Sequence, residues 1–342
     1  MDISSRPSLG FGMVIALLSA ATFGTSGPFA KSLLQSGWSP AAVVTLRVGL
    51  AALLLLVPAV KGLRGNWWLL RHNAGRVIGY GLAAVAGCQV AYFYALQSLS
   101  VGVALMLEYL GIMLVIGWMW LAHGQRPRPL TLVGAALAVV GLVFVLDVLS
   151  GAQVNIVGVL WGLGAAMGLA VFYVSAGHVD EESLPPVSFV GFSLAVGALT
   201  LIVLGFVGVL PWHSASVDVM LAGVSLPWWA AIGWLAVVAG ATAYVTGTMA
   251  ARELGSKVAG FVGLTEVLFA VVFAWLLLGE LPRVVQVFGG MLVLAGVVAV
   301  RLDESGVRLP PLRRRLPSLG SLARGGARPS RVEMAVGARS EH

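Results

Sequence analysis

The chain has 342 residues, of which 59% are hydrophobic and only 10% are charged, and its mean hydropathy is +0.95. A water-soluble domain carries far more charge, so this composition excludes one and predicts that lipid surrounds the chain up to about residue 300. The net charge of +7 could indicate a nucleic-acid partner. We expect none, because the Lys and Arg residues are distributed along the chain as the topology of a membrane protein requires.

Ten apolar stretches of about 20 residues predict ten transmembrane helices joined mostly by short loops. In chain order they cover residues 11–34, 39–60, 77–97, 101–122, 130–147, 155–178, 187–209, 228–251, 258–279 and 284–301. The first stretch does not end in a cleavage-like sequence, which favours a retained helix over a signal peptide. The run Gly-Thr-Ser-Gly-Pro at 24–28 predicts a local bend in that helix.

Three glycines recur in the second half of the chain at a fixed offset of 155 residues. Gly124, Gly134 and Gly141 are matched by Gly279, Gly289 and Gly296, and the segments around them align without a gap. This repeat predicts two copies of one membrane unit, residues 1–150 and 151–301, with substrate bound between them. Five spans is an odd number, so the second copy must enter the membrane from the opposite side. The predicted fold is an all-α polytopic membrane protein whose ten transmembrane helices form two inverted five-helix repeats.

The distribution of Lys and Arg predicts the orientation of these spans. With a cytoplasmic N-terminus, the inner segments before the tail hold Arg6, Lys61, Arg64, Arg71, Arg76, Arg126, Arg128, Arg252 and Lys257. The outer loops then hold only Arg283, while one inner loop, 178–183, is acidic. We therefore expect a multi-pass protein of the plasma (inner) membrane with both termini in the cytoplasm.

Residues 302–342 differ from the rest of the chain, because they are rich in Arg, Ser, Pro and Gly and have no apolar helical stripe. This composition predicts a disordered, basic cytoplasmic tail. Its arginines either contact anionic lipid or serve only to anchor the topology.

Four charged residues fall well within the predicted spans: Lys31, Arg47, Glu108 and Glu266. Each costs roughly 2.5–3.5 kcal/mol near a helix centre, so two cations and two acids indicate mutual compensation around an internal cavity. Arg47 either binds a substrate carboxylate or pairs with Glu108. Lys31 either binds the same group or extends its amine to the membrane surface. A carboxyl in a low-dielectric cavity suits a substrate amine or a coupled proton.

Glu108 and Glu266 occupy related places in the two copies, displaced by three residues, which keeps them on one helical stripe. Small residues flank both acids, as a close helix crossing beside a polar cavity requires. The alternative interpretation is that each acid pairs with a cation or binds a neighbouring backbone group.

Further candidates come from the third, sixth and eighth predicted helices, where Gln89 aligns with Tyr244 across the repeat. Tyr92, Tyr173 and Trp161 are possible lining residues, although aromatic side chains inside bundles more often serve packing. The single cysteine, Cys88, excludes a disulfide framework and a cysteine-based metal site. We expect no catalytic residue, no metal and no cofactor.

Several segments resemble the drug/metabolite transporter superfamily, specifically its EamA-like exporters. They are GPFAKSLLQSGWSPAAVVTLRVGLAALLLL, ALMLEYLG and GLTEVLFAVVFAWLLLGELP. The last is the most specific, although Val267 replaces the usual proline after Glu266, and the first half has His123-Gly124-Gln125 where LGE is common. The run LEYLG and the pairing of FAK with LR are similar to the threonine/homoserine-exporter branch.

This resemblance implies a secondary transporter that exports a small metabolite, favouring an amino acid or derivative, from a cavity lined by the first four helices of each half. It implies a small-molecule substrate, a lipid bilayer, coupled protons, and a monomer or homodimer. The alternatives are a sugar-phosphate, nucleotide-sugar or drug transporter, and, in another class, a membrane-embedded lipid-modifying enzyme. The two cations are few for a phosphate carrier, and the absence of an acid from the first and sixth helices disfavours a cationic-drug mechanism.

Overall fold

The computed structural model describes residues 9–111, 129–146, 155–176 and 182–304. The chain divides into two units, Met1–Val307 and Arg308–His342, and every described residue belongs to the first. The predicted tail beyond residue 304, the glycine at 124 and the arginines at 126 and 128 lie outside the described residues.

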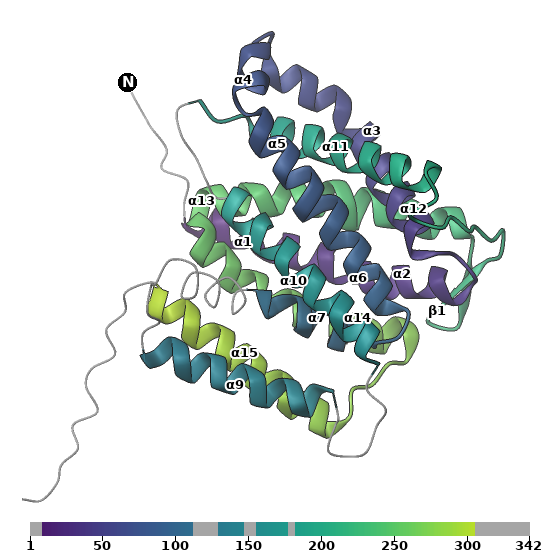
Figure 1. The fold of residues 1–342 in the computed structure, drawn as a ribbon, viewed down its shortest axis with the longest axis vertical. Coiled ribbons are helices and arrows are strands. Elements are labelled where there is room, and N and C mark those ends of the chain that lie inside the picture. The colour runs from purple at the N-terminus through teal and green to yellow at the C-terminus, as the bar shows by residue number, and fades with distance from the viewer. Residues whose placement is uncertain (1–8, 112–128, 147–154, 177–181, 305–342) are drawn as a thin grey trace, which may run out of the picture. The chain divides into compact units, whose positions relative to one another are not determined.

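Helices make up nearly all of the described structure (Figure 1). The first half contains α1 (Leu9–Gly24), α2 (Ser26–Gln35), α3 (Pro40–Leu63), α4 (Trp67–His72), α5 (Ala74–Tyr80), the π-helical segment η1 (Gly81–Gly87), α6 (Cys88–Leu96), α7 (Val101–Tyr109) and α9 (Pro129–Val145). The second half contains α10 (Ile156–Ala176), α11 (Pro186–Phe206), α12 (Trp228–Ala236), the π-helical segment η3 (Val237–Thr242), α13 (Ala243–Gly263), α14 (Thr265–Leu278) and α15 (Val284–Glu304).

Local sequence signals set several helix boundaries. The bend predicted at 24–28 is present, because α1 ends at Gly24 and α2 begins at Ser26. Ser39 accepts a hydrogen bond from the Ala42 amide at 3.2 Å, which caps α3 ahead of Pro40. The break predicted between the eighth and ninth helices falls at Gly255, where φ is +77° and the helical path of α13 is interrupted.

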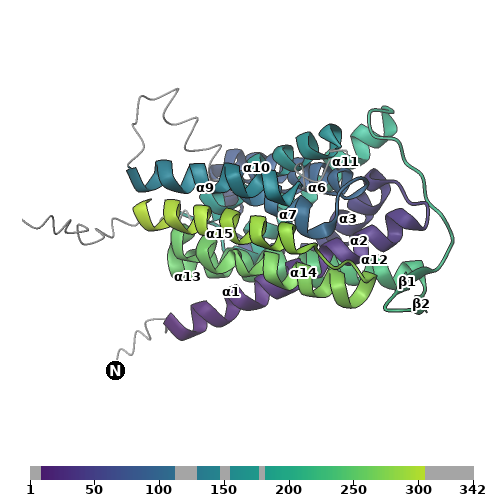
Figure 2. The ribbon, with the colours of Figure 1, turned by 90° about the horizontal axis from the view of Figure 1, so that it is seen from below.

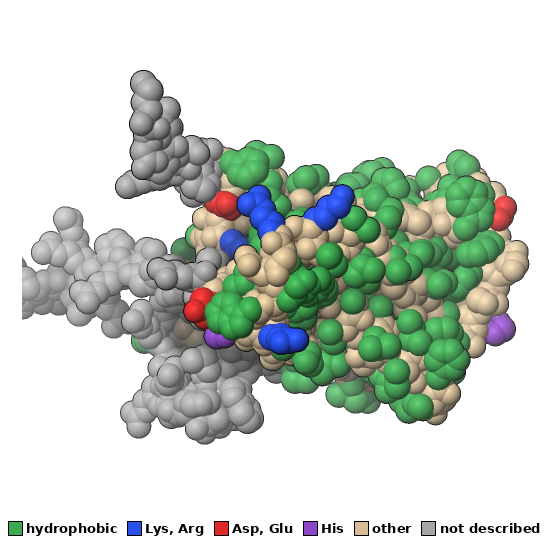
Figure 3. All heavy atoms as spheres, turned by 90° about the horizontal axis from the view of Figure 1, so that it is seen from above, with side chains coloured by type: hydrophobic (Ala, Val, Ile, Leu, Met, Phe, Trp, Pro, Cys, Tyr) green, Lys and Arg blue, Asp and Glu red, His purple; other side chains and the backbone are tan. Residues whose placement is uncertain are grey.

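Six helices in the described part of the chain are long and apolar enough to cross a membrane. They cover Gly10–Gln35, Pro40–Leu63, Ala74–Leu96, Pro186–Phe206, Trp228–Gly255 and Val258–Leu278, and shorter apolar helices cover Pro129–Val145, Ile156–Phe172 and Val284–Val300. Hydrophobic side chains cover most of the face seen in Figure 3, and Lys and Arg gather toward one end of it. The chain is therefore a multi-pass membrane protein, while the count of ten spans stays a prediction.

One small β-hairpin corrects the prediction of an all-α fold. Strand β1 (Val219–Leu221) pairs antiparallel with β2 (Val224–Leu226). Ala222 and Gly223 form the turn with φ of +52° and +76°, the left-handed geometry that two-residue hairpins favour. Strands of three residues are too short to show a period in the sequence, which is why the pattern of apolar residues did not predict them.

The connections between helices gather at two ends of the bundle. One end, which we call the Glu280 end, holds residues 36–39, 97–100, 207–227 and 279–283. There the His213 amide donates to Ser39 Oγ at 2.9 Å, and the Ala222 amide donates to the Leu277 carbonyl at 2.7 Å. The opposite, Arg252 end holds residues 64–66, 182–185 and 252–255, and Arg252 donates there to the Leu184 carbonyl at 2.6 Å. Figure 2 shows the hairpin at one end and the start of α1 at the other.

Helices from the two halves pair in a reciprocal pattern (Figures 1 and 2). Helices α9 and α15 lie side by side at one margin of the bundle, and α3 packs against α11 at the opposite margin. Between these pairs, α1 packs against α13 and α14, while its counterpart α10 packs against α6 and α7. Each half therefore contributes its first helix to the other half.

The recurrent glycines form the contact between α9 and α15. A Cβ atom added to Gly134 would lie 2.6 Å from the Gly296 carbonyl oxygen, and one added to Gly296 would lie 2.5 Å from the Gly134 oxygen. Gly141 and Gly289 face each other in the same reciprocal way, at 2.6 Å in both directions. The helices are therefore antiparallel, and each glycine faces the repeat partner of the other glycine in its own helix.

The two π-helical segments also follow the repeat. Val237 and Thr242 are the ends of η3. At the offset of 155 residues they correspond to Leu82 and Gly87, which both lie in η1. Nothing in the hydrophobic pattern predicts π-helical turns, so this correspondence is independent of the glycine offset.

We expect Gly141→Ala to destabilise the protein by about 1–3 kcal/mol, because the added methyl group would press on backbone atoms that have no room to move. Thermal unfolding of the purified protein in detergent measures this effect. Gly79→Ala is the matched control, since an added Cβ there meets nothing within 4 Å. Equal melting temperatures for the two variants would contradict the close contact.

Candidate substrate site

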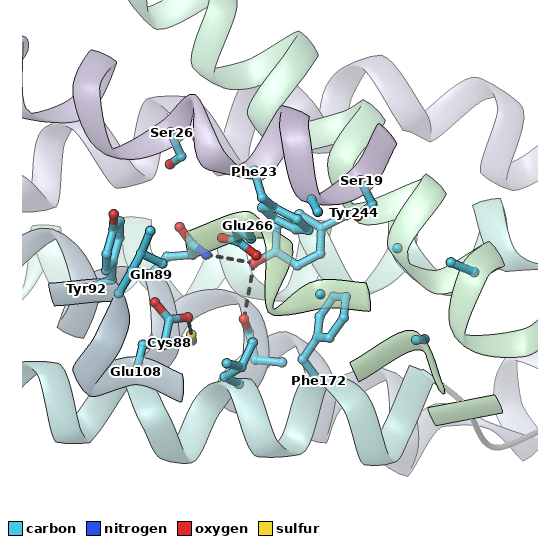
Figure 4. Close-up of a pocket in the computed structure, with 18 of the residues that line it drawn as sticks. Ser19, Phe23, Ser26, Cys88, Gln89, Tyr92, Glu108, Phe172, Tyr244 and Glu266 are labelled. Atoms are coloured by element: carbon cyan, nitrogen blue, oxygen red, sulfur yellow. Dashed lines mark hydrogen bonds between the residues drawn. The ribbon is translucent and has the colours of Figure 1, made fainter. Parts of the chain in front are cut away.

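A central cavity lies between the two halves of the described structure (Figure 4). Its lining comes from α1, α2, α3, η1, α6 and α7 of the first half and from α10, α13 and α14 of the second. The cavity has a volume of about 50 Å³, which is enough for a few water molecules. The family resemblance implied that the first four helices of each half line the cavity. All of them contribute to the described lining except α11, which corresponds to the predicted seventh helix.

Arg47 lies in this cavity, but both of its terminal nitrogens donate to protein groups. Nη1 donates to Gln89 Oε1, and Nη2 donates to the Ala239 carbonyl at 2.6 Å. The guanidinium also lies over the Phe93 ring, 5.5 Å from its centroid. A side chain 1% exposed and held on three sides acts as a bridge between α3, α6 and η3.

The hydrogen bonds continue from Arg47 across the interface between the halves. Gln89 Nε2 donates to Tyr244 Oη at 3.1 Å, and Tyr244 Oη donates to the Ala84 carbonyl at 3.2 Å. Gln89 and Tyr244, which the 155-residue offset aligns with each other, bind each other directly. Ala84 and Ala239 are also repeat partners, one in each π-helical segment. The chain of bonds thus runs from the π-helical turn of one half to that of the other.

The two predicted acids both line the cavity and are held by neighbours other than Arg47. Glu108 Oε1 accepts a weak hydrogen bond from Cys88 Sγ at 3.3 Å. Glu266 Oε2 lies 3.0 Å from Tyr109 Oη, which is also 2.6 Å from the Gly263 carbonyl oxygen. Neither acid forms an ion pair within the described residues. Both acids therefore lie at one cavity, and the sequence did not anticipate Cys88 and Tyr109 as their partners.

Small residues flank the acids as the sequence predicted. Ala259, Gly263 and Glu266 all line the cavity. In the other copy, a Cβ on Gly111 would lie 2.0 Å from the Ala166 carbonyl oxygen of α10, so two helix backbones cross closely beside Glu108.

Lys31 does not line the cavity. It forms an ion pair with Glu280 and donates to the Leu99 carbonyl at 2.9 Å, and Glu280 accepts a further bond from the Val101 amide at 3.1 Å. This cluster, the Lys31–Glu280 latch, joins α2, the start of α7 and the segment after α14 at the Glu280 end.

The remaining sequence candidates separate in the structure. Tyr92 lines the cavity, but Trp161 does not: it stacks on Tyr94, with ring centroids 4.8 Å apart, beside an apolar groove between α6 and α10. Tyr173 belongs to α10, but its side chain lies outside the described part of the structure. Position along a helix did not reveal that Trp161 lies on the far face of α10.

The lining residues that escaped the sequence-based selection include Ser19, Phe23, Ser26 and Phe172. Ser26 belongs to the bend that the Gly and Pro residues signalled, and this proximity could have marked it. The two phenylalanines pack edge-on against Tyr244, with centroids 5.0 and 5.9 Å from its ring, and nothing in the sequence distinguishes them from core residues. The described residues contain no group of three metal-ligating side chains.

A bundle of apolar helices that encloses a polar cavity between two matched halves has the architecture of a membrane transporter. Residues 10–147 and 156–302 match the EamA-like transporter family, and the chain belongs to it. The family predicted from the sequence motifs is therefore confirmed, and the chain is a transporter rather than an enzyme.

Among curated proteins, the threonine/homoserine exporter RhtA of Escherichia coli K12 is 25% identical over 299 residues, covering 86% of this chain and 90% of the relative. The uncharacterized inner membrane transporter YicL of Salmonella typhimurium LT2 is 22% identical over 300 residues, covering 86% of this chain and 96% of the relative. A solved crystal structure has a similar fold, with a TM-score of 0.58 at 18% identity over 88% of this chain and all of that one.

We expect Tyr244→Phe to destabilise the protein by about 1–3 kcal/mol, because the change leaves the Gln89 amide and the Ala84 carbonyl each short of a protein partner in a buried site. Tyr94→Phe makes the same chemical change on a half-buried tyrosine outside the network. Thermal unfolding in detergent compares the two variants, and a melting temperature for Tyr244→Phe equal to that of Tyr94→Phe would exclude a structural role for the bridge.

Proposed function

We propose that this protein is a secondary transporter that exports a small metabolite, favouring an amino acid or a derivative, across the plasma membrane by alternating access. The observation that carries the proposal is the buried cavity between the two halves, in which Glu108 and Glu266 both lie. The similarity to the threonine/homoserine exporter RhtA supports the choice of substrate class.

We further propose that residues 1–150 and 151–301 are inverted copies and that together they make ten spans. The antiparallel glycine contact supports the inversion, because a two-fold axis in the membrane plane brings Gly134 against Gly296 and Gly141 against Gly289. The match to the family in two segments and the matched π-helical turns support the division into two copies.

We place the Arg252 end in the cytoplasm, together with both chain termini. Lys61, Arg64 and Arg71 are exposed at that end, as the positive-inside rule requires. The start of α1 lies there too, since a Cβ on Gly12 would contact Leu254.

Alternating access is supported by the difference between the two ends of the cavity. At the Glu280 end, the Lys31–Glu280 latch and the stacked rings of Phe29 and Trp234, 5.2 Å apart, close the path. Toward the Arg252 end the lining consists largely of small residues, among them Gly247, Ala250 and Ala259. We assign this conformation as closed to the outside.

The engaged cations disfavour the alternative substrates. A sugar-phosphate or nucleotide-sugar carrier needs several cations facing the cavity, whereas Arg47 donates to Gln89 and the Ala239 carbonyl, and Lys31 lies in the latch. Glu108 and Glu266 remain as groups for a substrate amine or a coupled proton.

We expect Glu108→Gln to abolish the dependence of amino-acid flux on a pH gradient, because the amide keeps the shape of the side chain but cannot exchange a proton. Flux into or out of proteoliposomes, with and without the gradient, measures this. Glu253→Gln removes an exposed carboxylate at the Arg252 end and should leave the flux unchanged. Proton-coupled flux that survives in Glu108→Gln would remove Glu108 from the mechanism.

The single cysteine provides a native test of the latch, since Cys88 lines the cavity and the sequence has no other thiol. We expect Glu280→Gln to raise several-fold the rate at which a membrane-impermeant thiol reagent, added outside oriented vesicles, labels Cys88. Arg283→Gln changes a charge at the same end without touching Lys31 or Glu280 and should label at the wild-type rate. Equal rates for both variants would show that the latch does not close the cavity.

A further inference from the structure

Two buried hydroxyl groups in the cavity have no hydrogen-bond partner within the described structure. They are Ser26 Oγ, at the start of α2, and Tyr92 Oη, on α6. Both side chains are only 4% exposed, and both line the central cavity. Folded proteins rarely leave such groups unsatisfied, so a pair of them in one cavity points to a ligand that supplies the missing bonds.

Both hydroxyls belong to the region around the start of α2, where Ser26 is the first helical residue. A Cβ on Gly27, the residue after Ser26, would lie 2.6 Å from Tyr92 Oη. Tyr92 is one helical turn from Cys88, so the two side chains lie on the same face of α6. Cys88 donates a hydrogen bond to Glu108, so this face also contacts the carboxyl group. Figure 4 shows Ser26 and Tyr92 on the side of the cavity away from Phe172, with Glu108 close to Cys88.

The charges around this part of the cavity favour a cationic group. Glu108 and Glu266 are the two acids of the lining, and Arg47 is its one cation among the described residues. Arg47 donates one N–H from each terminal nitrogen to Gln89 and the Ala239 carbonyl, so two of its five N–H groups already bind the protein. Lys31, the other intramembrane cation, forms its ion pair with Glu280.

We propose that Ser26, Tyr92 and Glu108 form an ammonium-binding site, in which a carboxylate and two hydroxyl oxygens accept the three N–H bonds of a primary ammonium group. The site takes compounds that carry this group whether or not they carry a carboxylate, so an amino acid and its ester bind alike. This inference rests on the proposed transport of amino acids and narrows it, because it assigns recognition to the amine alone.

The test measures binding of three probes to the purified full-length protein by isothermal titration calorimetry in detergent. The probes are L-threonine, L-threonine methyl ester, which lacks the carboxylate, and N-acetyl-L-threonine, which lacks the ammonium. We expect the dissociation constants of threonine and its ester to agree within about threefold and that of the N-acetyl compound to be at least about tenfold weaker.

The variants Ser26→Ala and Tyr92→Phe separate ligand binding from stability. Each should weaken binding of threonine and of its ester by about tenfold, because a hydrogen bond to a charged group is lost. Neither should lower the melting temperature of the empty protein, since each removes a buried group that has no partner. Tyr94→Phe is the matched control and should change neither quantity.

Four results would overturn the inference. Binding of threonine with loss of the ester, or equal binding of the N-acetyl compound, would show that the carboxylate is recognised, and the proposed transport of amino acids would survive. Unchanged binding in both hydroxyl variants would exclude the ammonium site and would leave the proposed transport of amino acids standing. Failure of the folded protein to bind any of the three probes would instead count against both the ammonium site and the proposed amino-acid substrate.

Discussion

The structure depends on one constraint, which is that polar groups in a membrane must be satisfied inside the protein. Arg47 meets this constraint with backbone and side chain together: it binds the Ala239 carbonyl, and Gln89 extends the contact to Tyr244 and the Ala84 carbonyl. The two carbonyls belong to equivalent π-helical turns of the two halves. A local departure from α-helical geometry in each copy is thus joined to the other by one continuous set of bonds.

This arrangement explains why the polar residues of the cavity divide into two groups. Arg47, Gln89 and Tyr244 bind one another and the backbone, so they hold the halves in register. Glu108 and Glu266 have only a thiol or a phenol as side-chain partner, and Ser26 and Tyr92 have none within the described residues. Arg47, the charged residue of the cavity with the most hydrogen-bond partners, is therefore structural. The acids and the two hydroxyl residues, which have few partners or none, remain open to a ligand.

Much of the fold was predictable because apolar length and repeat spacing reflect the demands of lipid directly. The bend near Ser26 and the break near Gly255 were both readable from residue type and spacing. The π-helical turns and the short hairpin at Val219–Leu226 were not, since neither leaves a hydrophobic period. In the site, intramembrane charge identified Glu108 and Glu266, but it could not distinguish Lys31 in the latch from a cavity cation, because that depends on which helices meet.

The glycine contact between α9 and α15 has a consequence for how such proteins diversify. It is built from backbone and hydrogen-sized side chains, and neither helix contributes to the described lining of the cavity. Substitutions that alter which compound is carried therefore leave the joint between the copies untouched. A scaffold whose assembly and whose selectivity rest on separate helices can acquire new cargoes by drift in the cavity alone, without first finding compensating changes in how its halves hold together.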